Sequence, residues 1–168
     1  MTTAIVPGTF DPITSGHLDV IERATQLFDE VVVGVAASKH KNGTGPLFSA
    51  DCRVDLIREA TRHLNSVRVV TFDSLLIDFA AAEQGDVIVK GLRALTDFEH
   101  EFQMAALNSR MNRKIETLFI MSAPEFMYLS SSAVKEIAAL GGSVSGLVPE
   151  CVENALRNSF SNYRETSK

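Results

Sequence analysis

Short apolar runs alternate with helical patterns along the whole chain. Five runs rich in β-branched residues are expected to form strands, over residues 4–7, 30–37, 66–72, 86–91 and 117–121. Most of these runs are continuously apolar, which is typical of strands buried on both faces of a parallel sheet. Helical periodicity predicts helices over about 16–28, 50–63, 75–84, 96–112, 131–140 and 149–163. The repeated order of strand and helix predicts a doubly wound, Rossmann-like α/β fold, with a five-stranded parallel sheet, helices on both faces and a C-terminal helix.

Local signals mark several of the expected helix ends. Thr96 and Glu99 have the spacing of a capping box, with the threonine as N-cap. Pro149 suits the first turn of the last helix, and Gly141–Gly142 suit the end of the helix before it. Because no repeat, linker or low-complexity segment interrupts the pattern, we expect a single domain over residues 1–168, with about 164–168 as a loose tail.

Charge and cysteine content narrow the classes of function. The net charge of -5 argues against a general nucleic-acid binder, which would need a basic face. Cys52 and Cys151 belong to no CxxC pair or His/Cys cluster, so we expect reduced thiols rather than a structural zinc site. The chain shows no signal peptide, and no apolar run approaches the roughly 18 residues that span a bilayer. The sequence therefore predicts a cytoplasmic protein with no nucleic-acid or membrane partner.

The segment PGTFDPITSGH, residues 7–17, follows the first expected strand. In a doubly wound sheet, ligands bind outside the carboxyl ends of the strands, where the strand order reverses. Gly8 and Gly16 allow close approach of the backbone, and the following helix N-terminus favours an anion. His17 falls in the first helical turn, near the expected place of that anion. The alternative is a capped helix with an incidental histidine, and the loop matches neither the Walker A nor the GxGxxG motif.

Cationic side chains follow two other expected strands. Lys39, His40 and Lys41 follow the second strand, although such a cluster is usually solvated surface. Lys90 ends an apolar strand, where its charge costs desolvation free energy unless it meets an anion, and Arg93 follows closely. The alternative for Lys90 is an extended side chain with its ammonium group in water.

Hydroxyl groups and one carboxylate complete the expected site. Ser130, Ser131 and Ser132 open a helix, where one serine is an ordinary N-cap and three together suggest a second phosphate-binding segment. Glu101 lies on the helix after Lys90, and the capping box does not explain it. We find no activated nucleophile and no Ser-His-Asp order. A cleft with several cations and two hydroxyl-rich helix starts suits in-line phosphoryl or nucleotidyl transfer, which depends mostly on positioning and charge stabilisation.

Three segments together resemble a known family. GTFDPITSGH resembles the GTFDPxTxGH signature of nucleotidyltransferases with a HIGH-type motif, with Thr14 in place of the first histidine and His17 as the second. KGLRALTDFEHE and LSSSAVKEIA narrow the resemblance to the bacterial phosphopantetheine adenylyltransferases, over residues 3–160. The resemblance implies transfer of an adenylyl group from ATP to 4'-phosphopantetheine with Mg2+, giving dephospho-coenzyme A and pyrophosphate in coenzyme A biosynthesis.

The same resemblance implies roles for individual residues. His17 would stabilise the transition state, and Lys41 and Arg93 would act with it as catalytic cations. The residues implied to bind ATP are Thr9, Phe10, His17, Gly91, Leu92, Arg93, Glu101, Phe126, Met127, Tyr128, Leu129, Ser130, Ser131 and Ser132. The residues implied to bind the acceptor are Thr9, Lys41, Leu76 and Lys90. The ligands of Mg2+ stay unknown, because no compact carboxylate cluster stands out.

Three positions depart from the family's usual pattern. The loop after the second strand is a residue or two longer, which leaves open whether Lys39 or Lys41 replaces the family lysine. Lys90 stands where many members have arginine, so it keeps the charge but loses the bidentate fork. His100 stands where tyrosine is common, and the sequence assigns it no role.

The resemblance also implies a homohexamer and feedback inhibition by coenzyme A. The expected helix 96–112 carries two apolar stripes, as does a helix that meets a partner. The stripes consist of Phe98, Phe102 and Ala105, and of Met104, Leu107 and Met111.

Other functions remain open at this point. One is another small nucleotidyltransferase, such as a nicotinamide mononucleotide adenylyltransferase, against which the KGLR and SSSAVKE segments count. A second is a non-catalytic sensor of coenzyme A or nucleotide, against which His17, Lys90 and Arg93 count, because a pure binder needs no transition-state donor. A tRNA-binding synthetase fragment is disfavoured by the acidic charge and by the lack of a KMSKS-type loop.

Overall fold

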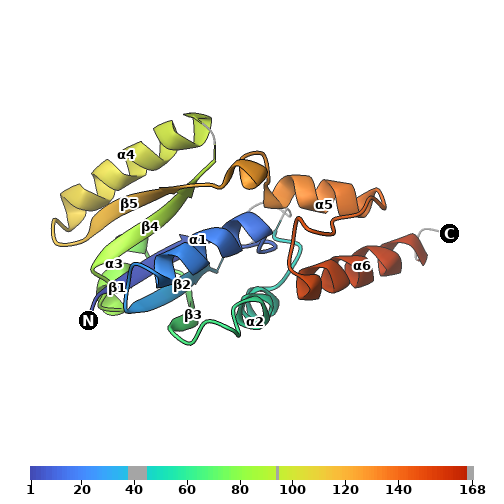
Figure 1. Cartoon of the computed structure of the whole chain (residues 1–168), viewed down its shortest axis with the longest axis horizontal. Helices are drawn as coiled ribbons and strands as arrows, with labels where there is room; N and C mark the ends of the chain where they lie inside the picture. Colours follow the sequence, from blue (N-terminus) through green and yellow to red (C-terminus); the bar gives the residue numbers. More distant parts are fainter. Residues whose placement is uncertain (38–44, 94, 166–168) are drawn as a thin grey trace.

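The computed structural model describes residues 1–37, 45–93 and 95–165 (Figure 1). Its centre is a parallel sheet with the strand order β3-β2-β1-β4-β5. The strands are β1 (Thr3–Gly8), β2 (Glu30–Ala36), β3 (Val67–Phe72), β4 (Val87–Leu92) and β5 (Glu116–Met121). Each strand lies within one residue of its predicted bounds. The predicted five-stranded parallel sheet and doubly wound α/β fold are therefore confirmed.

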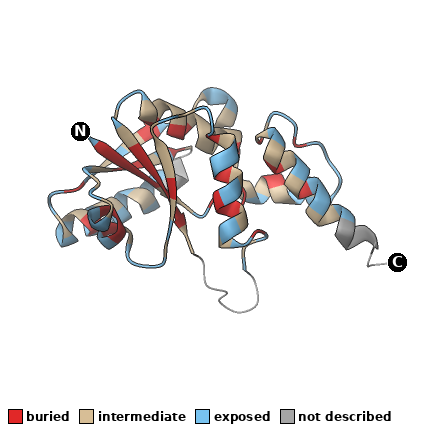
Figure 2. Ribbon diagram, turned by 90° about the horizontal axis from the view of Figure 1, so that it is seen from below, coloured by how far each residue is buried: buried red, intermediate tan, exposed pale blue. Residues whose placement is uncertain are grey.

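Helices cover both faces of this sheet. They are α1 (Ser15–Thr25), α2 (Ala50–Ala60), α3 (Leu76–Ala82), α4 (Leu95–Met111), α5 (Ser131–Ala139) and α6 (Glu150–Glu165), with a 3-10 turn η1 (Pro124–Phe126). Apolar residues of α1, α2, α5 and α6 form one core, and α3 contributes to a second core on the other face. Figure 2 shows the buried strands between these layers.

Alternation along the strands explains why they read as continuously apolar. In β1, Ala4 and Val6 belong to the core of the α1 and α2 layer, whereas Ile5 belongs to the core under α3. In β2, Val31 and Val33 face the first layer and Val32 faces the second. Because both faces are covered, neither set of side chains needs to be polar.

Several helix ends differ from the predicted bounds. α1 ends at Thr25 rather than at residue 28, although Phe28 still packs against the core from outside the helix. α4 begins at Leu95, so Thr96 lies in its first turn rather than at the predicted N-cap. The prediction for α5 is confirmed, because Gly141 has a φ of 82° and the amides of Gly141 and Gly142 bond the carbonyls of Ala138 and Ile137 in a Schellman motif.

The sheet opens between its two central strands. β1 pairs with β2 over all six of its residues, but it pairs with β4 only at Ala4↔Val87 and Ile5↔Ile88. Beyond Ile5 and Ile88 the two strands diverge, and their connections leave toward opposite faces of the sheet. This is the point of strand-order reversal, where a doubly wound sheet leaves a crevice.

Candidate active site

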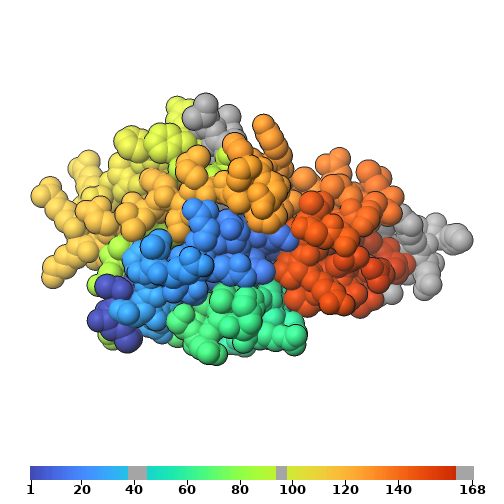
Figure 3. Space-filling model, in the orientation of Figure 1, coloured from blue at the N-terminus to red at the C-terminus, as the bar shows by residue number. Residues whose placement is uncertain are grey.

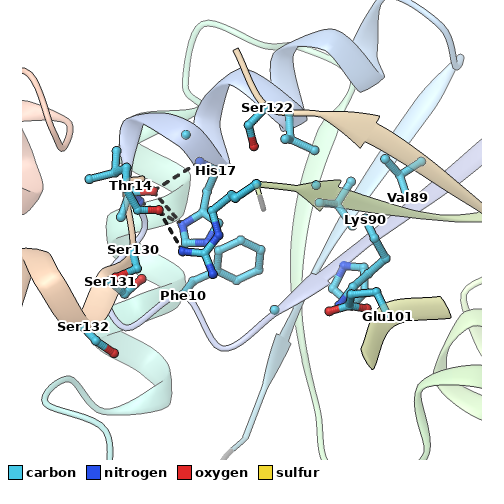
Figure 4. A pocket seen from close by; sticks show the side chains of 18 of the residues that line it. Phe10, Thr14, His17, Val89, Lys90, Glu101, Ser122, Ser130, Ser131 and Ser132 are labelled. Carbon is cyan, nitrogen blue, oxygen red and sulfur yellow. Dashed lines mark hydrogen bonds and ion pairs between the residues drawn. The ribbon is translucent and has the colours of Figure 1, made fainter. Parts of the chain in front are cut away.

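A cavity of about 410 Å³ lies at the carboxyl ends of β1 and β4. Its lining comes from β1, the start of α1, β4, α4 and the start of α5. The lining residues are Val6, Pro7, Gly8, Phe10, Thr14, Gly16, His17, Val20, Val89, Lys90, Gly91, Arg93, His100, Glu101, Ser122, Leu129, Ser130, Ser131 and Ser132. Figure 4 shows that the hydroxyl-rich helix starts lie on one side of the cavity and Lys90 with Glu101 on the other. The structure thus brings together segments more than 100 residues apart in the sequence. Ser131 Oγ, at the start of α5, bonds the carbonyl of Pro12, which lies 119 positions earlier.

His17 is fixed in orientation by the start of α1. Thr14 is the N-cap, and its Oγ1 accepts a hydrogen bond from the His17 amide at 3.3 Å. In return, the Thr14 amide donates to Nδ1 of His17 at 3.0 Å. His17 therefore takes the place that glutamate or glutamine usually has in a capping box. The ring thus completes the helix start and also lines the cavity, and its catalytic role stays a prediction.

The protonation state of His17 follows from its surroundings. Burial, and then the positive charges of Arg93 and Lys90, lower its pKa from 6.5 to about 4. The imidazole is therefore neutral at pH 7. Because Nδ1 accepts the Thr14 amide, the single ring proton lies on Nε2. His17 is thus a neutral hydrogen-bond donor at the cavity rather than a cation.

Phe10 supports the His17 ring from the side. The two rings meet edge to face, with centroids 5.1 Å apart and an interplanar angle of 75°. Phe10 is buried and has a φ of 50°, in the left-handed region. A Cβ on Gly8 would lie 2.9 Å from the Phe10 ring, so glycine is required there by this ring. The sequence analysis had explained Gly8 only by the approach of a ligand.

The two cations on β4 and its following turn hold different parts of the site. Lys90 Nζ lies 3.2 Å from Oε1 of Glu101 on α4, and both side chains are about one quarter exposed, at 22% and 24%. Arg93 Nη1 donates to the carbonyl of Leu129 at 2.8 Å, which joins the end of β4 to the start of α5. In this structure the anion that Lys90 meets is the Glu101 carboxylate, and its contact with a substrate phosphate stays a prediction.

The three serines at the start of α5 have different partners. Ser130 is the N-cap, and its Oγ accepts from the Ala133 amide at 3.1 Å. Ser131 Oγ donates to the carbonyl of Pro12 at 2.8 Å. Ser132 is exposed and bonds no residue that the structure describes. All three line the cavity, but Ser130 and Ser131 also have structural roles.

Several residues predicted to bind substrate lie outside the cavity lining. Thr9 has an exposed side chain, and its carbonyl accepts from Arg53. Leu92 is buried, Met127 is 37% exposed and Tyr128 is 92% exposed. Phe126 packs behind the site, where a Cβ on Gly16 would meet its Cβ at 3.2 Å. Lys39, His40 and Lys41 lie outside the described residues.

Leu76 lines a second cavity, of about 200 Å³, beside the first. Its lining residues are Leu76, Ile88, Lys90, His100, Glu101, Met104, Ala105, Asn108 and Thr117. Lys90, His100 and Glu101 line both cavities. Leu76 and Lys90, which are predicted to bind the acceptor, therefore line connected cavities, and His100, which had no predicted role, lines both.

A buried polar cluster behind the first cavity was missed by the sequence analysis. The Asp11 carboxylate accepts from the amides of Leu47 and Phe48 and lies 2.6 Å from Lys135 Nζ. Arg53 is 1% exposed and donates to three carbonyls, those of Thr9, Ala36 and Phe48. The only sequence signal is a set of charges within otherwise apolar segments, and the pattern does not say that they meet.

The described part of the chain contains neither a cluster of metal ligands nor a membrane-spanning helix. No group of three or more His, Cys, Asp or Glu side chains is arranged there to hold a metal ion. Glu101 is the single carboxylate among the residues lining the first cavity. Within the same residues, no helix is both long and apolar enough to cross a bilayer.

Comparison with known proteins identifies the family. Residues 5–137 match the family model described as cytidylyltransferase-like. The phosphopantetheine adenylyltransferase of Moorella thermoacetica is 51% identical over 156 residues, covering 93% of this chain and 96% of the relative. The chain belongs to the phosphopantetheine adenylyltransferases. Another member, from Clostridium botulinum (strain Eklund 17B / Type B), is 47% identical over 160 residues, covering 95% and 99%.

Solved structures agree on the fold. A putative nicotinate-nucleotide adenylyltransferase from Vibrio parahaemolyticus superposes with a TM-score of 0.67 at 16% identity, covering 93% of this chain and 99% of that one. At this identity the likeness concerns the fold alone. Membership of the phosphopantetheine adenylyltransferase family confirms the resemblance seen in the GTFDPITSGH, KGLRALTDFEHE and LSSSAVKEIA segments.

Proposed function

We propose that this protein transfers the adenylyl group of ATP to the phosphate of 4'-phosphopantetheine, giving dephospho-coenzyme A and pyrophosphate. The observation that carries the proposal is the neutral His17 ring. Its Nδ1 is held by the Thr14 amide, so its Nε2–H is available to the cavity in which Lys90, Arg93 and the α5 start converge. A donor fixed before the reaction stabilises charge that develops in the transition state.

The reaction needs no general base. The nucleophile is an oxygen of the acceptor phosphate, which is already ionised at pH 7. This oxygen attacks the α-phosphorus of ATP, a new phosphorus–oxygen bond forms, and the bond to the bridging oxygen breaks as pyrophosphate leaves with the electron pair. The enzyme has to bring two anions together and neutralise their charge. Lys90, Arg93 and the N-termini of α1 and α5 would supply the positive charge, and His17 would donate to an oxygen of the transferred phosphate.

The two cavities suggest where each substrate lies. ATP would occupy the first cavity, with its phosphates near His17, Arg93 and the serines of α5. Of the predicted ATP residues, Phe10, Gly91, Glu101 and Leu129 also line it, whereas roles for Thr9, Leu92, Phe126, Met127 and Tyr128 stay predictions.

The acceptor would place its phosphate at Lys90 and its arm in the second cavity. That cavity is apolar at Leu76, Met104 and Ala105, and it offers polar groups at Asn108 and Thr117. This mixture suits a chain of methylene groups interrupted by amides. The acceptor roles of Lys41 and Thr9 also stay predictions.

A divalent cation is general for nucleotidyl transfer, and we propose Mg2+. Mg2+ commonly keeps several waters and is bound by substrate phosphates with one or two carboxylates. The single carboxylate in the lining, Glu101, and the serine hydroxyls fit a cation that enters with ATP rather than a resident metal site. Its chemistry would be to neutralise charge on the ATP phosphates.

We also propose the homohexamer that the sequence resemblance implies. Its support is an apolar surface that we name the α4/β5 face, and Figure 3 shows the atoms of α4 and β5 in yellow and light orange. Its exposed side chains are Phe98, Phe102, Met104, Leu107 and Met111 of α4, and Met121 of β5. An exposed apolar surface of this extent suits contact with further copies of the chain. Feedback inhibition by coenzyme A and the cytoplasmic location stay predictions.

The first experiment measures pyrophosphate release from ATP, Mg2+ and 4'-phosphopantetheine. Three variants are compared with the wild type: His17→Ala, His17→Gln and His63→Ala. Glutamine is a usual capping-box residue, so His17→Gln retains the helix start while removing the imidazole. His63 is an exposed histidine paired with Glu22 and serves as the matched control.

We expect release by the wild type and by His63→Ala, and a loss of at least about 100-fold in both His17 variants. Release that is unchanged in His17→Gln would keep the reaction but reject the role of His17. No release with 4'-phosphopantetheine, together with release with nicotinamide mononucleotide, would reject the proposed acceptor. Binding of coenzyme A without any release would indicate a sensor.

A further inference from the structure

The ion pair of Lys90 and Glu101 lies between two cavities. Both residues line the nucleotide-sized cavity of about 410 Å³ and the neighbouring cavity of about 200 Å³. Lys90 reaches this place from β4 and Glu101 reaches it from α4, and Figure 4 shows the two side chains together on one side of the cavity. Their charged atoms are 3.2 Å apart. A ligand that extends from one cavity into the other has to pass this pair.

Lys90 is the charge that the proposed reaction needs for the acceptor phosphate. Its ammonium group is a compact point charge on a flexible stem, so it can exchange one anionic partner for another. Arg93, the other cation of the lining, donates to the Leu129 carbonyl and is directed toward the start of α5. Among the residues that the structure describes, Glu101 is the single carboxylate in either lining. The ligand's phosphate and Glu101 therefore compete for the same cation.

We propose that Glu101 is an internal competitor that holds the place of the acceptor phosphate on Lys90 until the acceptor arrives. This inference rests on the proposed function. In the empty site, the Glu101 carboxylate neutralises Lys90, which lies only 22% exposed. When the acceptor binds, its phosphate takes over Lys90, and Glu101 is released toward the nucleotide. The exchange replaces a singly charged partner by one with a charge near two at pH 7.

The proposal makes Glu101 a residue that sets acceptor affinity and selects for the charge of the acceptor. A group with no charge cannot replace a carboxylate on an ammonium group, so a dephosphorylated acceptor would leave the ion pair closed. Lys90 and Glu101 share their position in the two linings, which is what places them in competition with the acceptor phosphate.

The test is a double-mutant cycle. Calorimetry measures the affinity of each variant for the ligand in the absence of ATP. The variants are Glu101→Gln, Lys90→Met and the combination of both. Glu99→Gln is the matched control, because it removes the same charge from α4 at an exposed position outside both linings. The ligands are 4'-phosphopantetheine and, separately, inorganic phosphate. Circular dichroism and thermal unfolding verify that each variant folds.

We expect Glu101→Gln to tighten binding of both ligands about three- to fivefold, which is the range for the loss of one partly exposed ion pair. Glu99→Gln should stay within about twofold of the wild type. Lys90→Met should weaken binding at least about tenfold, and adding Glu101→Gln to it should change nothing further, because competition requires the cation.

Two outcomes would overturn the inference. One is binding to Glu101→Gln that is unchanged or weaker. The other is equal tightening in the Lys90→Met background, which would indicate general repulsion by the carboxylate rather than competition for Lys90. Failure of the proposed function looks different. In that case the wild type would neither bind 4'-phosphopantetheine nor release pyrophosphate, while the phosphate measurements would still decide whether Glu101 competes for Lys90.

Discussion

The ammonium group of Lys135 lies 2.6 Å from Oδ2 of Asp11, which joins α5 to the loop after β1. The Asp11 side chain is 6% exposed, and the Lys135 side chain is 30% exposed. Asp11 also accepts the amides of Leu47 and Phe48, so one carboxylate ties three segments together behind the cavity. Because Ser130–Ser132 begin the same helix, Lys135 helps to place the hydroxyl-rich end of α5 against His17.

Replacing Lys135 by Met should lower the free energy of unfolding by about 1–3 kcal/mol, because it leaves a buried carboxylate without its cation. Lys135→Arg should recover most of this loss. Urea unfolding measures both values. Arg157→Met is the control. Arg157 pairs with Glu153 at the surface, where its side chain is 65% exposed, so loss of this pair should lower the free energy of unfolding by less than about 1 kcal/mol. Equal losses in the two Met variants would show that the buried pair contributes nothing special.

His17 should titrate far below an ordinary histidine. Its pKa of about 4 in the folded protein lies below the unfolded value of 6.5, so the unfolded chain binds more protons in this window. Above pH 6.5 the ring is neutral in both states, and the free energy of unfolding does not depend on it. As the pH falls from 6.5 toward 4, the unfolded chain gains a proton that the folded protein does not, and the free energy of unfolding falls by about 3 kcal/mol at most.

Histidine NMR titration measures this directly, with the His17 resonance assigned from its absence in His17→Gln. We expect a midpoint near 4 that rises in Lys90→Met, because Lys90 is one of the charges that lower this pKa. Urea unfolding should show a smaller acid loss for His17→Gln than for the wild type between pH 7 and 4.5. A midpoint near 6.5 would mean that the ring is solvated and able to carry charge at neutral pH.

The three serines of α5 should separate stability from nucleotide binding. Ser130→Ala removes the N-cap and should cost about 1 kcal/mol of stability. Ser131→Ala removes the bond to the Pro12 carbonyl and should cost about 0.5–1.5 kcal/mol. Ser132→Ala should change stability by less than about 0.5 kcal/mol and act mainly on the KM for ATP. Thermal unfolding and steady-state kinetics distinguish these effects, and a stability loss in Ser132→Ala alone would contradict the assignment.

Gly91 is required by the close approach of α1 to β4. A Cβ on Gly91 would lie 2.9 Å from Cγ2 of Val20, and Val20 is 5% exposed. Gly91→Ala should therefore cost about 1–3 kcal/mol of stability. In a Val20→Ala background the added cost should fall below about 0.5 kcal/mol, because the opposing methyl group is gone. If urea unfolding gives the same cost in both backgrounds, the strain has another source.

The α4/β5 face should determine the oligomeric state. Phe102 is 59% exposed, and Phe102→Glu places a charge where we propose contact between copies. Sedimentation velocity should show the wild type as a hexamer and Phe102→Glu as smaller species. Leu27→Glu is the control, because Leu27 is 67% exposed after α1, on the other side of the sheet. A wild type that sediments as a monomer would reject the proposed hexamer.

Sequence patterns were sufficient for the sheet and for the main residues of the cavity. Strands covered on both faces have no polar alternation, so β1 and β2 could be recognised as parallel strands from their apolar runs alone. Once the strand ends were placed, the crevice between β1 and β4 followed, and with it the convergence of His17, Lys90 and Arg93. The end of α1 was harder to predict, because Phe28 continues the apolar pattern although the helix has already ended.

Pairings between distant charges could not be predicted in the same way. Lys90 and Glu101 were each noticed, but their contact depends on how α4 crosses the end of β4. Asp11 and Lys135 are 124 positions apart, and either charge alone resembles ordinary solvated surface. Arg53 lies on α2 at a position where helical periodicity expects an apolar side chain, and only the three carbonyls around it explain its burial.

The bond from Ser131 to the Pro12 carbonyl spans 119 positions and has a consequence for the timing of synthesis. β1 and α1 leave the ribosome first, but the crevice between β1 and β4 lacks one wall until α5 has emerged and docked. A nascent chain can therefore assemble its sheet while still unable to retain nucleotide. A chain truncated after β5 would lack both this wall and the apolar residues of α5 and α6 that complete the first core, so it should bind ATP no better than an unfolded chain does.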